Sequence, residues 1–313
     1  HLGEFWAQFN FLLPGFLGGH RQFTKLFKTP IQSHGDQERK VLLNQRIKPF
    51  ILRRTKEKIA KELPAKTEII QKVRIEGKQA ELYESVRLTM DSRLKEIIAA
   101  KGINRSQIEI LDALLKLRQV CCHPQLLSLD SAQSVTQSAK LELLMEMLPE
   151  LIDEGRKILI FSQFTSMLAL IEEQLTRSKL SYCKLTGAST KRQEIVESFQ
   201  NGDIPVFLIS LRAGGVGLNL TEADTVIHFD PWWNPAVENQ ATDRAYRIGQ
   251  KHNVLVHKFV CRGTIEEKID LMIKEKISLA GDILDSSGEK LLTELDNTEL
   301  MELVALDIKS STG

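Results

Sequence analysis

The 313-residue chain has 42% hydrophobic and 27% charged residues, enough for roughly two domains with buried cores. Its 42 basic and 41 acidic side chains nearly cancel, so the overall charge favours neither a nucleic acid nor a membrane as partner. No apolar run approaches the roughly 18 residues of a membrane span, and no signal peptide is visible. We therefore expect a protein that does not span a membrane. Because the chain starts at His1 instead of Met, we also expect it to be part of a longer protein.

The four cysteines indicate a reducing compartment. Cys121 and Cys122 are adjacent, Cys183 and Cys261 stand alone, and no Cys-x-x-Cys pair occurs. Adjacent cysteines rarely bridge, so reduced thiols in a cytoplasmic or nuclear protein are expected. The run Cys121-Cys122-His123 lacks the second ligand pair that zinc sites usually have, and we therefore expect no metal site.

Charge is unevenly distributed along the chain. Residues 38–74 hold twelve Lys or Arg against four Asp or Glu, whereas residues 263–313 hold five Lys against twelve acidic residues. A basic segment in a neutral chain suits a phosphate backbone or an acidic surface, and a solvated helix face is an equal alternative.

The predicted elements begin with short helices and turns in residues 1–37, interrupted by prolines. Two longer helices follow at 78–100 and 104–120, and Leu111, Leu114, Leu115 and Leu117 fit one buried stripe of the second. A Ser- and Gln-rich loop spans 128–138. From residue 139 on, strands are predicted at 157–161, 182–185, 206–210, 225–229 and 254–260, alternating with helices at 141–152, 164–175, 195–199, 235–248 and 264–277. This alternation predicts an α/β fold with a parallel sheet sandwiched by helices.

Ligands of open parallel sheets bind beyond the carboxyl ends of the strands. In this sequence the corresponding loops are polar, Gly-rich or aromatic, and they cover residues 162–165, 186–187, 211–217 and 230–235. We therefore predict that this edge of the sheet is the working surface.

Two of these segments suit phosphate. Gly214, Gly215 and Gly217 would let backbone N–H groups approach an oxyanion, although from the glycines alone a tight strand-to-helix turn is the simpler explanation. On a helix over 235–248, the side chains Gln240, Asp243, Arg244 and Arg247 would share one face, while Val237, Ala241, Ala245 and Ile248 would pack on the sheet. Two guanidiniums one turn apart suit a phosphate with developing charge. The alternative is a solvated face on which Asp243 pairs with Arg247.

Two tryptophans, Trp232 and Trp233, stand between Pro231 and Pro235. A Trp on a rigid loop can stack on nucleic acid, or it can belong to the core. We expect one of each, with Trp233 beside Asn234 at the exposed edge.

Together these segments resemble the second half of a SWI/SNF-type ATPase, a superfamily-two DNA translocase. The resemblance is carried by Phe-Leu-Leu-Pro-Gly-Phe-Leu-Gly at 11–18, the basic linker at 48–56 and 63–67, Leu-Lys-Leu-Arg-Gln-Val-Cys-Cys-His-Pro at 115–124, motif IV at 157–164, motif V at 207–220 and motif VI at 240–250. The last of these, Gln-Ala-Thr-Asp-Arg-Ala-Tyr-Arg-Ile-Gly-Gln, is highly specific and distinguishes this family from RNA helicases.

The resemblance implies a RecA-like fold with a helical protrusion and linker at its N-terminal side. It divides the chain into the end of a first-lobe protrusion with a basic inter-lobe linker (1–75), a second-lobe protrusion (76–138), the RecA-like helicase C-terminal lobe (139–280) and a C-terminal brace or tail (281–313). A Gly-Lys-Thr phosphate loop and an Asp-Glu-x-His motif are missing from the sequence. ATP with Mg²⁺ would therefore be held mainly by a first lobe that the chain lacks, and this half alone would not hydrolyse ATP.

The resemblance also assigns roles to residues. Arg244 and Arg247 would act as catalytic arginine fingers, and Gly215, Gly217, Gln240 and Asp243 would complete the nucleotide cleft. The expected contacts to double-stranded DNA are Gln163, Phe164, Thr165, Gly187, Ser210, Leu211, Arg212, Ala213, Trp233 and Asn234. Leu211 replaces a Thr of many relatives, which weakens a hydroxyl contact there.

The expected partners are double-stranded DNA, the first RecA-like lobe in cis and, in a eukaryote, a nucleoprotein such as the nucleosome. The compact loops favour a bacterial, cytoplasmic protein, and a eukaryotic one would be nuclear. Two alternatives stay open. The first is a DNA-binding or protein-docking module with no role for ATP, which would leave Arg244 and Arg247 unexplained. The second is a strand-separating helicase, against which the sequence shows no wedge domain that could separate the strands.

Overall fold

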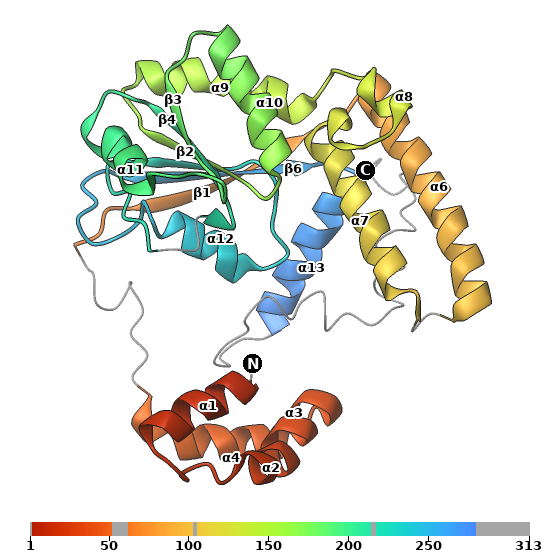
Figure 1. The fold of residues 1–313 in the computed structure, drawn as a ribbon, viewed down its shortest axis with the longest axis vertical. Coiled ribbons are helices and arrows are strands. Elements are labelled where there is room, and N and C mark those ends of the chain that lie inside the picture. Colours follow the sequence, from red (N-terminus) through yellow and green to blue (C-terminus); the bar gives the residue numbers. More distant parts are fainter. Residues whose placement is uncertain (1, 52–61, 103–104, 214–216, 280–313) are drawn as a thin grey trace. The chain divides into compact units, whose positions relative to one another are not determined.

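The computed structural model describes residues 2–51, 62–102, 105–213 and 217–279 (Figure 1). The chain divides into two compact units, His1–Glu62 and Leu63–Gly313. Among the described residues, no helix combines the length and the apolar content that crossing a bilayer requires. The predicted brace at 281–313 and much of the basic linker at 48–56 lie outside the described residues.

The regular elements among the described residues of the first unit are all helices or helical turns. It comprises α1 (Leu2–Leu12), α2 (His20–Phe23), a π-helical turn (Thr24–Lys28), α3 (Thr29–His34), α4 (Gln37–Ile47) and a 3₁₀ turn (Lys48–Phe50). Buried aromatic and aliphatic side chains form its own small core: Phe9, Leu17, Phe23, Phe27, Leu43 and Ile47. The structure confirms the short helices that the sequence predicts for residues 1–37.

The second unit is built on one sheet of six parallel strands in the order β1-β6-β5-β2-β4-β3. The strands are β1 (Lys66–Val73), β2 (Ile158–Ser162), β3 (Tyr182–Leu185), β4 (Val206–Ser210), β5 (Thr225–His228) and β6 (Val254–Cys261). Every residue of the central strands β2, β4 and β5 is buried, as expected where helices cover both faces of a parallel sheet. The predicted α/β fold is confirmed.

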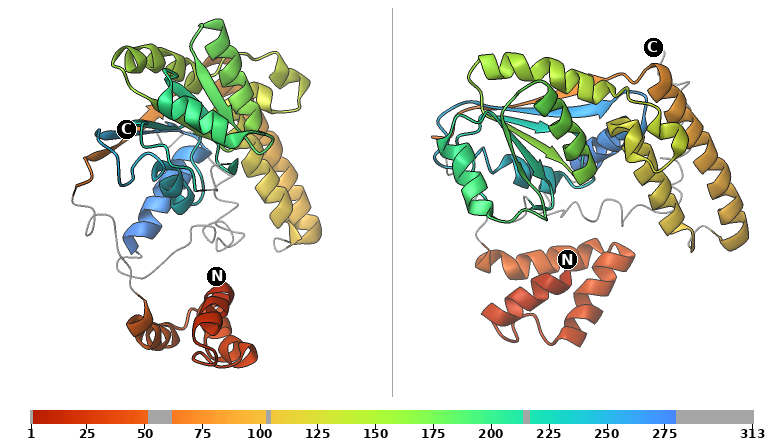
Figure 2. Two further views of the ribbon diagram at one scale, coloured as in Figure 1. Left: turned by 60° about the vertical axis from the view of Figure 1, so that its left-hand side comes forward. Right: turned by 45° about the horizontal axis from the view of Figure 1, so that its top comes forward.

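Helices cover both faces of this sheet (Figures 1 and 2). They are α9 (Ala139–Asp153) and α10 (Thr165–Arg177) on one face, and α11 (Arg192–Asn201) and α12 (Pro235–Thr242) on the other. Successive residues of a strand point to opposite faces. Accordingly, Ile160 and Leu208 pack with the first pair of helices, whereas Phe161 and Phe207 pack with the second.

A helical protrusion adjoins the carboxyl end of β6. It is formed by α6 (Gly77–Lys101) and α7 (Gln107–Cys122), with α13 (Ile265–Leu279) packed on α7 and the short helix α8 (Asp130–Gln133) nearby. The stripe predicted on α7 is only partly correct. Leu114 and Leu117 are fully buried, but Leu111 and Leu115 are 38% and 41% exposed. Ile110 and Cys121 are buried on the same face of the helix as Leu114 and Leu117, whereas Leu111 and Leu115 lie beside that face.

Strand β1 is an element that the sequence analysis did not predict. It pairs with β6 along its whole length, from Lys66 opposite Val254 to Val73 opposite Cys261. Its first three residues are exposed because β1 lies at the edge of the sheet. The strand therefore contains charged residues, and no apolar run marks it in the sequence.

The predicted helix over 235–248 is too long. α12 ends at Thr242, and the carbonyl groups that a helix continuing past Ile248 would use bind groups from outside the helix. The carbonyl of Arg244 accepts a hydrogen bond from the amide of Leu220 at 3.0 Å, and that of Ala245 accepts one from the side chain of Gln250 at 3.1 Å. Ile248, predicted to pack on the sheet, is 79% exposed.

Candidate functional site at the carboxyl edge of the sheet

The loops singled out in the sequence follow neighbouring strands. β5, β2, β4 and β3 are adjacent in the sheet, and the last residues of β2 and β4, Ser162 and Ser210, lie opposite one another. Because all strands are parallel, the described loop residues that follow them, at 163–165, 186–191, 211–213 and 229–235, lie along one edge. We call this edge the rim.

A buried carboxylate joins two rim loops. Asp230, 1% exposed, accepts hydrogen bonds from the hydroxyl of Ser162 and from the amide of Gln163 at 3.2 Å. The hydroxyl of Ser162 also accepts a hydrogen bond from the amide of Phe164 at 3.1 Å. Burial raises the pKa of Asp230, and the positive charge of Arg118 opposes that rise. The turn after β2 is therefore fixed by Asp230, a side chain of the loop that follows β5.

In the loop after β4, one predicted DNA contact is exposed and three are buried. The amide of Leu211 donates to the carbonyl of Ser162 at 3.0 Å, and the hydroxyl of Ser210 accepts the amide of Ala213 at 3.3 Å. The side chains of Ser210, Leu211 and Ala213 are at most 7% exposed. Arg212 is exposed, so it is the side chain of this turn that is available to an anion.

The prediction of one core tryptophan and one at the exposed edge is not confirmed, because both tryptophans are half-buried and both pack against hydrophobic cores. Trp232 packs against the core between the sheet and α12, and its amide donates to Glu238 at 2.7 Å. Trp233 packs against the core of the protrusion, with the guanidinium of Arg118 4.7 Å from its ring centroid. Asn234 is 4% exposed, and its side chain accepts the amide of Ala236 as the N-cap of α12.

The two arginines of motif VI lie in the turn after α12. Arg244 is 6% exposed and Arg247 is exposed. Burial lowers the pKa of Arg244, and the charge of Arg247 lowers it further. The two cations are thus close together, but the turn brings them together and not the shared helical face that the sequence predicted. A pair of like charges is stabilised by a bound anion, and arginine suits phosphate in particular.

The remaining predicted cleft residues are accessible where the structure describes them. Gly217, Gln240 and Asp243 are exposed, as are Gly187 and Thr165 on the neighbouring loops. Gln163 and Phe164 are half-buried. Gly214 and Gly215 lie outside the described residues.

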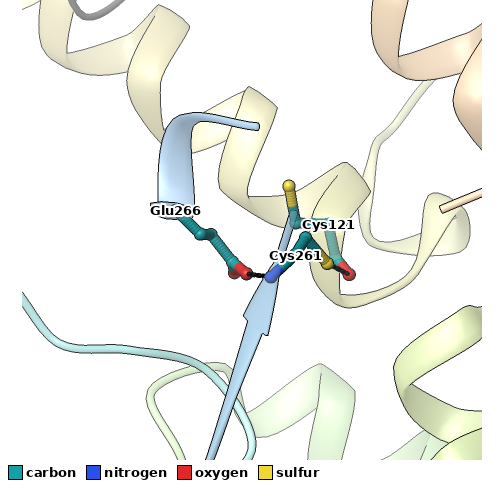
Figure 3. A group of neighbouring side chains, drawn as sticks. All are labelled: Cys121, Cys261 and Glu266. Carbon is teal, nitrogen blue, oxygen red and sulfur yellow. Dashed lines mark hydrogen bonds between the residues drawn. The ribbon is translucent and has the colours of Figure 1, made fainter. Parts of the chain in front are cut away.

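Cys121, Cys261 and Glu266 place three potential ligand atoms within 4.8 Å of one another (Figure 3). Their chemistry does not suit a metal ion. The carboxylate of Glu266 already pairs with the ammonium of Lys140 at 2.7 Å and accepts the amide of Cys261 at 2.9 Å. Burial raises the pKa of the Cys261 thiol well above its usual value, whereas metals bind the thiolate.

Three buried charged residues that bind the loop after β5 were not predicted from the sequence. Arg118 on α7, Lys140 on α9 and Glu238 on α12 are each at most 6% exposed, and each binds a backbone group of the 229–232 segment. The signal in the sequence was weak, because a lone Arg or Lys inside an amphipathic helix is usually solvated.

Comparisons with known proteins agree with this geometry. Residues 139–249 match the family model described as the helicase conserved C-terminal domain, and residues 1–126 match the SNF2-related domain. A putative ATP-dependent helicase/translocase of Bacillus subtilis is 41% identical over 97% of this chain and 33% of its own length. The human SWI/SNF-related matrix-associated actin-dependent regulator of chromatin subfamily A member 1 is 34% identical over 97% of this chain and 30% of its own length. The chain thus spans about a third of these relatives.

Two solved structures are similar as well. The Sulfolobus solfataricus SWI2/SNF2 ATPase core in complex with dsDNA has 41% identity and a TM-score of 0.64, covering 96% of this chain and 64% of that one. The C-terminal domain of the Sulfolobus solfataricus SWI2/SNF2 ATPase has 38% identity and a TM-score of 0.61. There the match covers 77% of this chain and 99% of the solved one.

Proposed function

Because the chain belongs to the SWI2/SNF2 family of ATPases, we propose that it is the second half of an ATP-driven motor that moves along double-stranded DNA. The observation that carries this proposal is the pair Arg244 and Arg247 in the turn after α12. Burial and a neighbouring positive charge both act on Arg244, and a polyphosphate at this position would relieve the repulsion. Arg247 would reach the phosphates from the solvent side and Arg244 from the protein side.

The nucleotide needs groups that this chain does not supply. The sequence lacks a Gly-Lys-Ser/Thr loop and an Asp-Glu-x-His motif, so a first RecA-like lobe in cis would bind most of ATP and its Mg²⁺. The present half would contribute the two guanidiniums, with Gln240, Asp243 and Gly217 beside them. Guanidiniums stabilise the charge that develops on the transferred phosphoryl group.

The rim loops would hold the DNA. Arg212, Thr165 and Gly187 are exposed on loops that follow adjacent strands, and Thr165 begins α10, whose N-terminus favours a phosphate. Contacts of this kind reach the backbone and not the bases, so binding would be independent of sequence and sensitive to salt.

Duplex tracking is favoured over strand separation. A wedge that splits stacked bases must project into the duplex. Trp233 is held by packing against the protrusion and by the guanidinium of Arg118, which leaves it unsuited to that role. A triplex-displacement assay should therefore give a signal, and unwinding of a forked duplex should not. Efficient unwinding without triplex displacement would favour the helicase alternative.

The central experiment uses the full-length protein with its first lobe. Arg244→Ala and Arg247→Ala should each lower DNA-stimulated ATP hydrolysis by about 10³-fold, the range found for arginine fingers, while DNA affinity is largely retained. Arg177→Ala is the matched control, because Arg177 ends α10 at the opposite edge of the sheet and is exposed. The 313-residue chain alone should not hydrolyse ATP. Near-parental turnover in both rim variants would show that the arginine assignment is wrong.

A further inference from the structure

We propose that Arg118 is a positioning residue for the DNA grip: it ties the rim loops 163–165 and 229–235 to each other and to the protrusion helix α7. Its consequence for DNA rests on the proposed function, whereas its structural part concerns the 313-residue chain alone. No residue of the protrusion is otherwise assigned a part in DNA binding.

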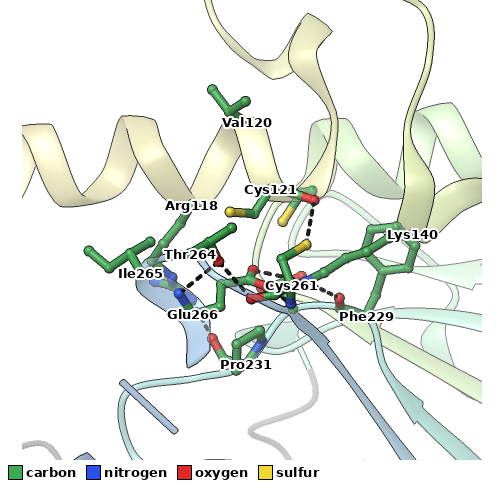
Figure 4. A network of polar contacts seen from close by, with 12 residues as sticks. Arg118, Val120, Cys121, Lys140, Phe229, Pro231, Cys261, Thr264, Ile265 and Glu266 are labelled. Atoms are coloured by element: carbon green, nitrogen blue, oxygen red, sulfur yellow. Dashed lines mark hydrogen bonds and ion pairs between the residues drawn. The ribbon is translucent and has the colours of Figure 1, made fainter. Parts of the chain in front are cut away.

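The contacts of one buried side chain carry the inference. Arg118 is 2% exposed although its guanidinium is charged. One terminal nitrogen donates to the side-chain oxygen of Gln163 at 3.2 Å, and the other donates to the carbonyl of Pro231. The centre of the guanidinium lies 4.7 Å from the ring of Trp233. Figure 4 shows the side chain reaching from α7 to Pro231.

A second buried cation holds the same segment. The ammonium of Lys140 donates to the carbonyl of Phe229 at 3.0 Å and pairs with Glu266 (Figure 4). Cations therefore bind the carbonyls on both sides of Asp230. Asp230 in turn accepts the amide of Gln163, so the two loops share one connected set of contacts with Arg118 at its centre.

The arrangement is not the one that stability alone would favour. Burying a guanidinium costs free energy, and packed apolar residues often replace a buried charge without loss. Within the described part of the chain, Nε of Arg118 and the side-chain nitrogen of Gln163 are buried without a hydrogen-bond partner. The guanidinium instead fixes the relative positions of its partners, because its rigid planar fork binds two acceptors and an aromatic ring at the same time.

Two loops fixed in this way grip the DNA backbone as a unit. If the two loops that carry Gln163 and Trp233 move independently, the contacts of each loop with the DNA backbone must be ordered separately when DNA binds. The cost of that additional ordering lowers the affinity. The loss should appear in DNA binding and in its coupling to ATP hydrolysis, because the contacts of Arg118 are to Gln163, Pro231 and Trp233, on the loops that would hold DNA.

The first test uses the 313-residue chain. In a Trp6→Phe, Trp232→Phe background, Trp233 is the remaining tryptophan and its emission reports its surroundings directly. Arg118→Met should shift that emission to longer wavelength and increase quenching by acrylamide. Arg87→Met is the control, since Arg87 is also buried in the protrusion but pairs with Glu84 within α6. Emission and quenching equal to those of the control would overturn the structural part of the proposal.

The second test uses the full-length protein. The DNA concentration for half-maximal ATPase stimulation should rise about tenfold in Arg118→Met, as for the loss of hydrogen bonds from a charged group, with hydrolysis in the absence of DNA unchanged. Arg118→Lys keeps the charge but not the fork, and should restore only part of the effect. If Arg118→Met and Arg87→Met lower stability alike and leave the half-maximal DNA concentration alike, Arg118 is only structural. A parental protein that DNA fails to stimulate would contradict the proposed function instead, and the Trp233 measurement would still decide the role of Arg118.

Discussion

We expect His228 to make the sheet unit less stable in mild acid. His228 ends β5, is 1% exposed, and lies with Nε2 2.9 Å from the hydroxyl of Thr242 and its ring stacked on Phe161. Burial lowers its pKa from 6.5 to about 4, and the surrounding charges of Glu238 and Lys258 act on it in opposite directions. The folded protein thus keeps this imidazole neutral at pH values where the unfolded chain binds a proton.

The sign and size follow from proton linkage. Between pH 6.5 and about 4 the unfolded state binds more protons, so the free energy of unfolding falls as the pH is lowered. One pKa unit corresponds to about 1.4 kcal/mol, which gives a total loss of about 3 kcal/mol, of which about 2 kcal/mol is reached by about pH 5. At that pH most carboxylates are still ionised, so the histidine contribution is separable from theirs.

Urea unfolding of the 313-residue chain provides the assay. A Trp6→Phe background limits tryptophan emission to the second unit, which contains Trp232 and Trp233. His228→Gln keeps a hydrogen-bonding group near the hydroxyl of Thr242 but cannot titrate. Its free energy of unfolding should fall by about 2 kcal/mol less than that of the parent between about pH 7.5 and about pH 5. Parallel pH dependences in the two proteins would refute the reasoning.

Two further predictions concern buried charges behind the rim. Lys140→Met leaves the fully buried carboxylate of Glu266 without its cation and should lower the free energy of unfolding by about 3–5 kcal/mol, whereas the Lys140→Met, Glu266→Leu double variant should recover most of the loss. A double variant as unstable as the single one would contradict this. Glu238→Ala removes both the acceptor for the Trp232 amide and the partner of Lys258, and should cost about 1–3 kcal/mol in the same urea assay. Glu238→Gln, which keeps the acceptor, should cost less, and equal losses in the two variants would assign the effect to charge alone.

The sequence predicted those parts of the fold that depend on local pattern. Strands β2, β4 and β5 are short apolar runs because both of their faces are covered, and this composition is visible without a structure. β1 is an edge strand with charged residues at its start, so it lacks that signal. The pairing with β6, which identifies it, involves residues almost two hundred positions away.

The end of α12 could not be predicted for a related reason. Helical periodicity continues through Ile248, but the amide of Leu220 and the side chain of Gln250 bind the carbonyls that a longer helix would use. Both groups come from outside the helix. The same holds for Arg118 and Lys140, whose partners lie on other elements. A pattern along the chain can locate a charged residue, but it cannot say what that residue contacts.

The residues expected to touch DNA fall into two groups, and the division bears on how such a surface binds. Ser210, Leu211, Ala213 and Asn234 are buried, and the two with polar side chains hydrogen-bond to backbone amides. They are therefore suited to shape the loops, while Arg212 and exposed backbone are suited to meet the ligand. A ligand surface formed by Arg212 and the exposed backbone at Gly187 and Gly217 matches phosphate oxygens, which recur along every duplex, and does not match base edges. Under the proposed function, this division accounts for a motor that must move over any sequence, because a loop whose polar side chains are turned inward has few groups with which to read bases.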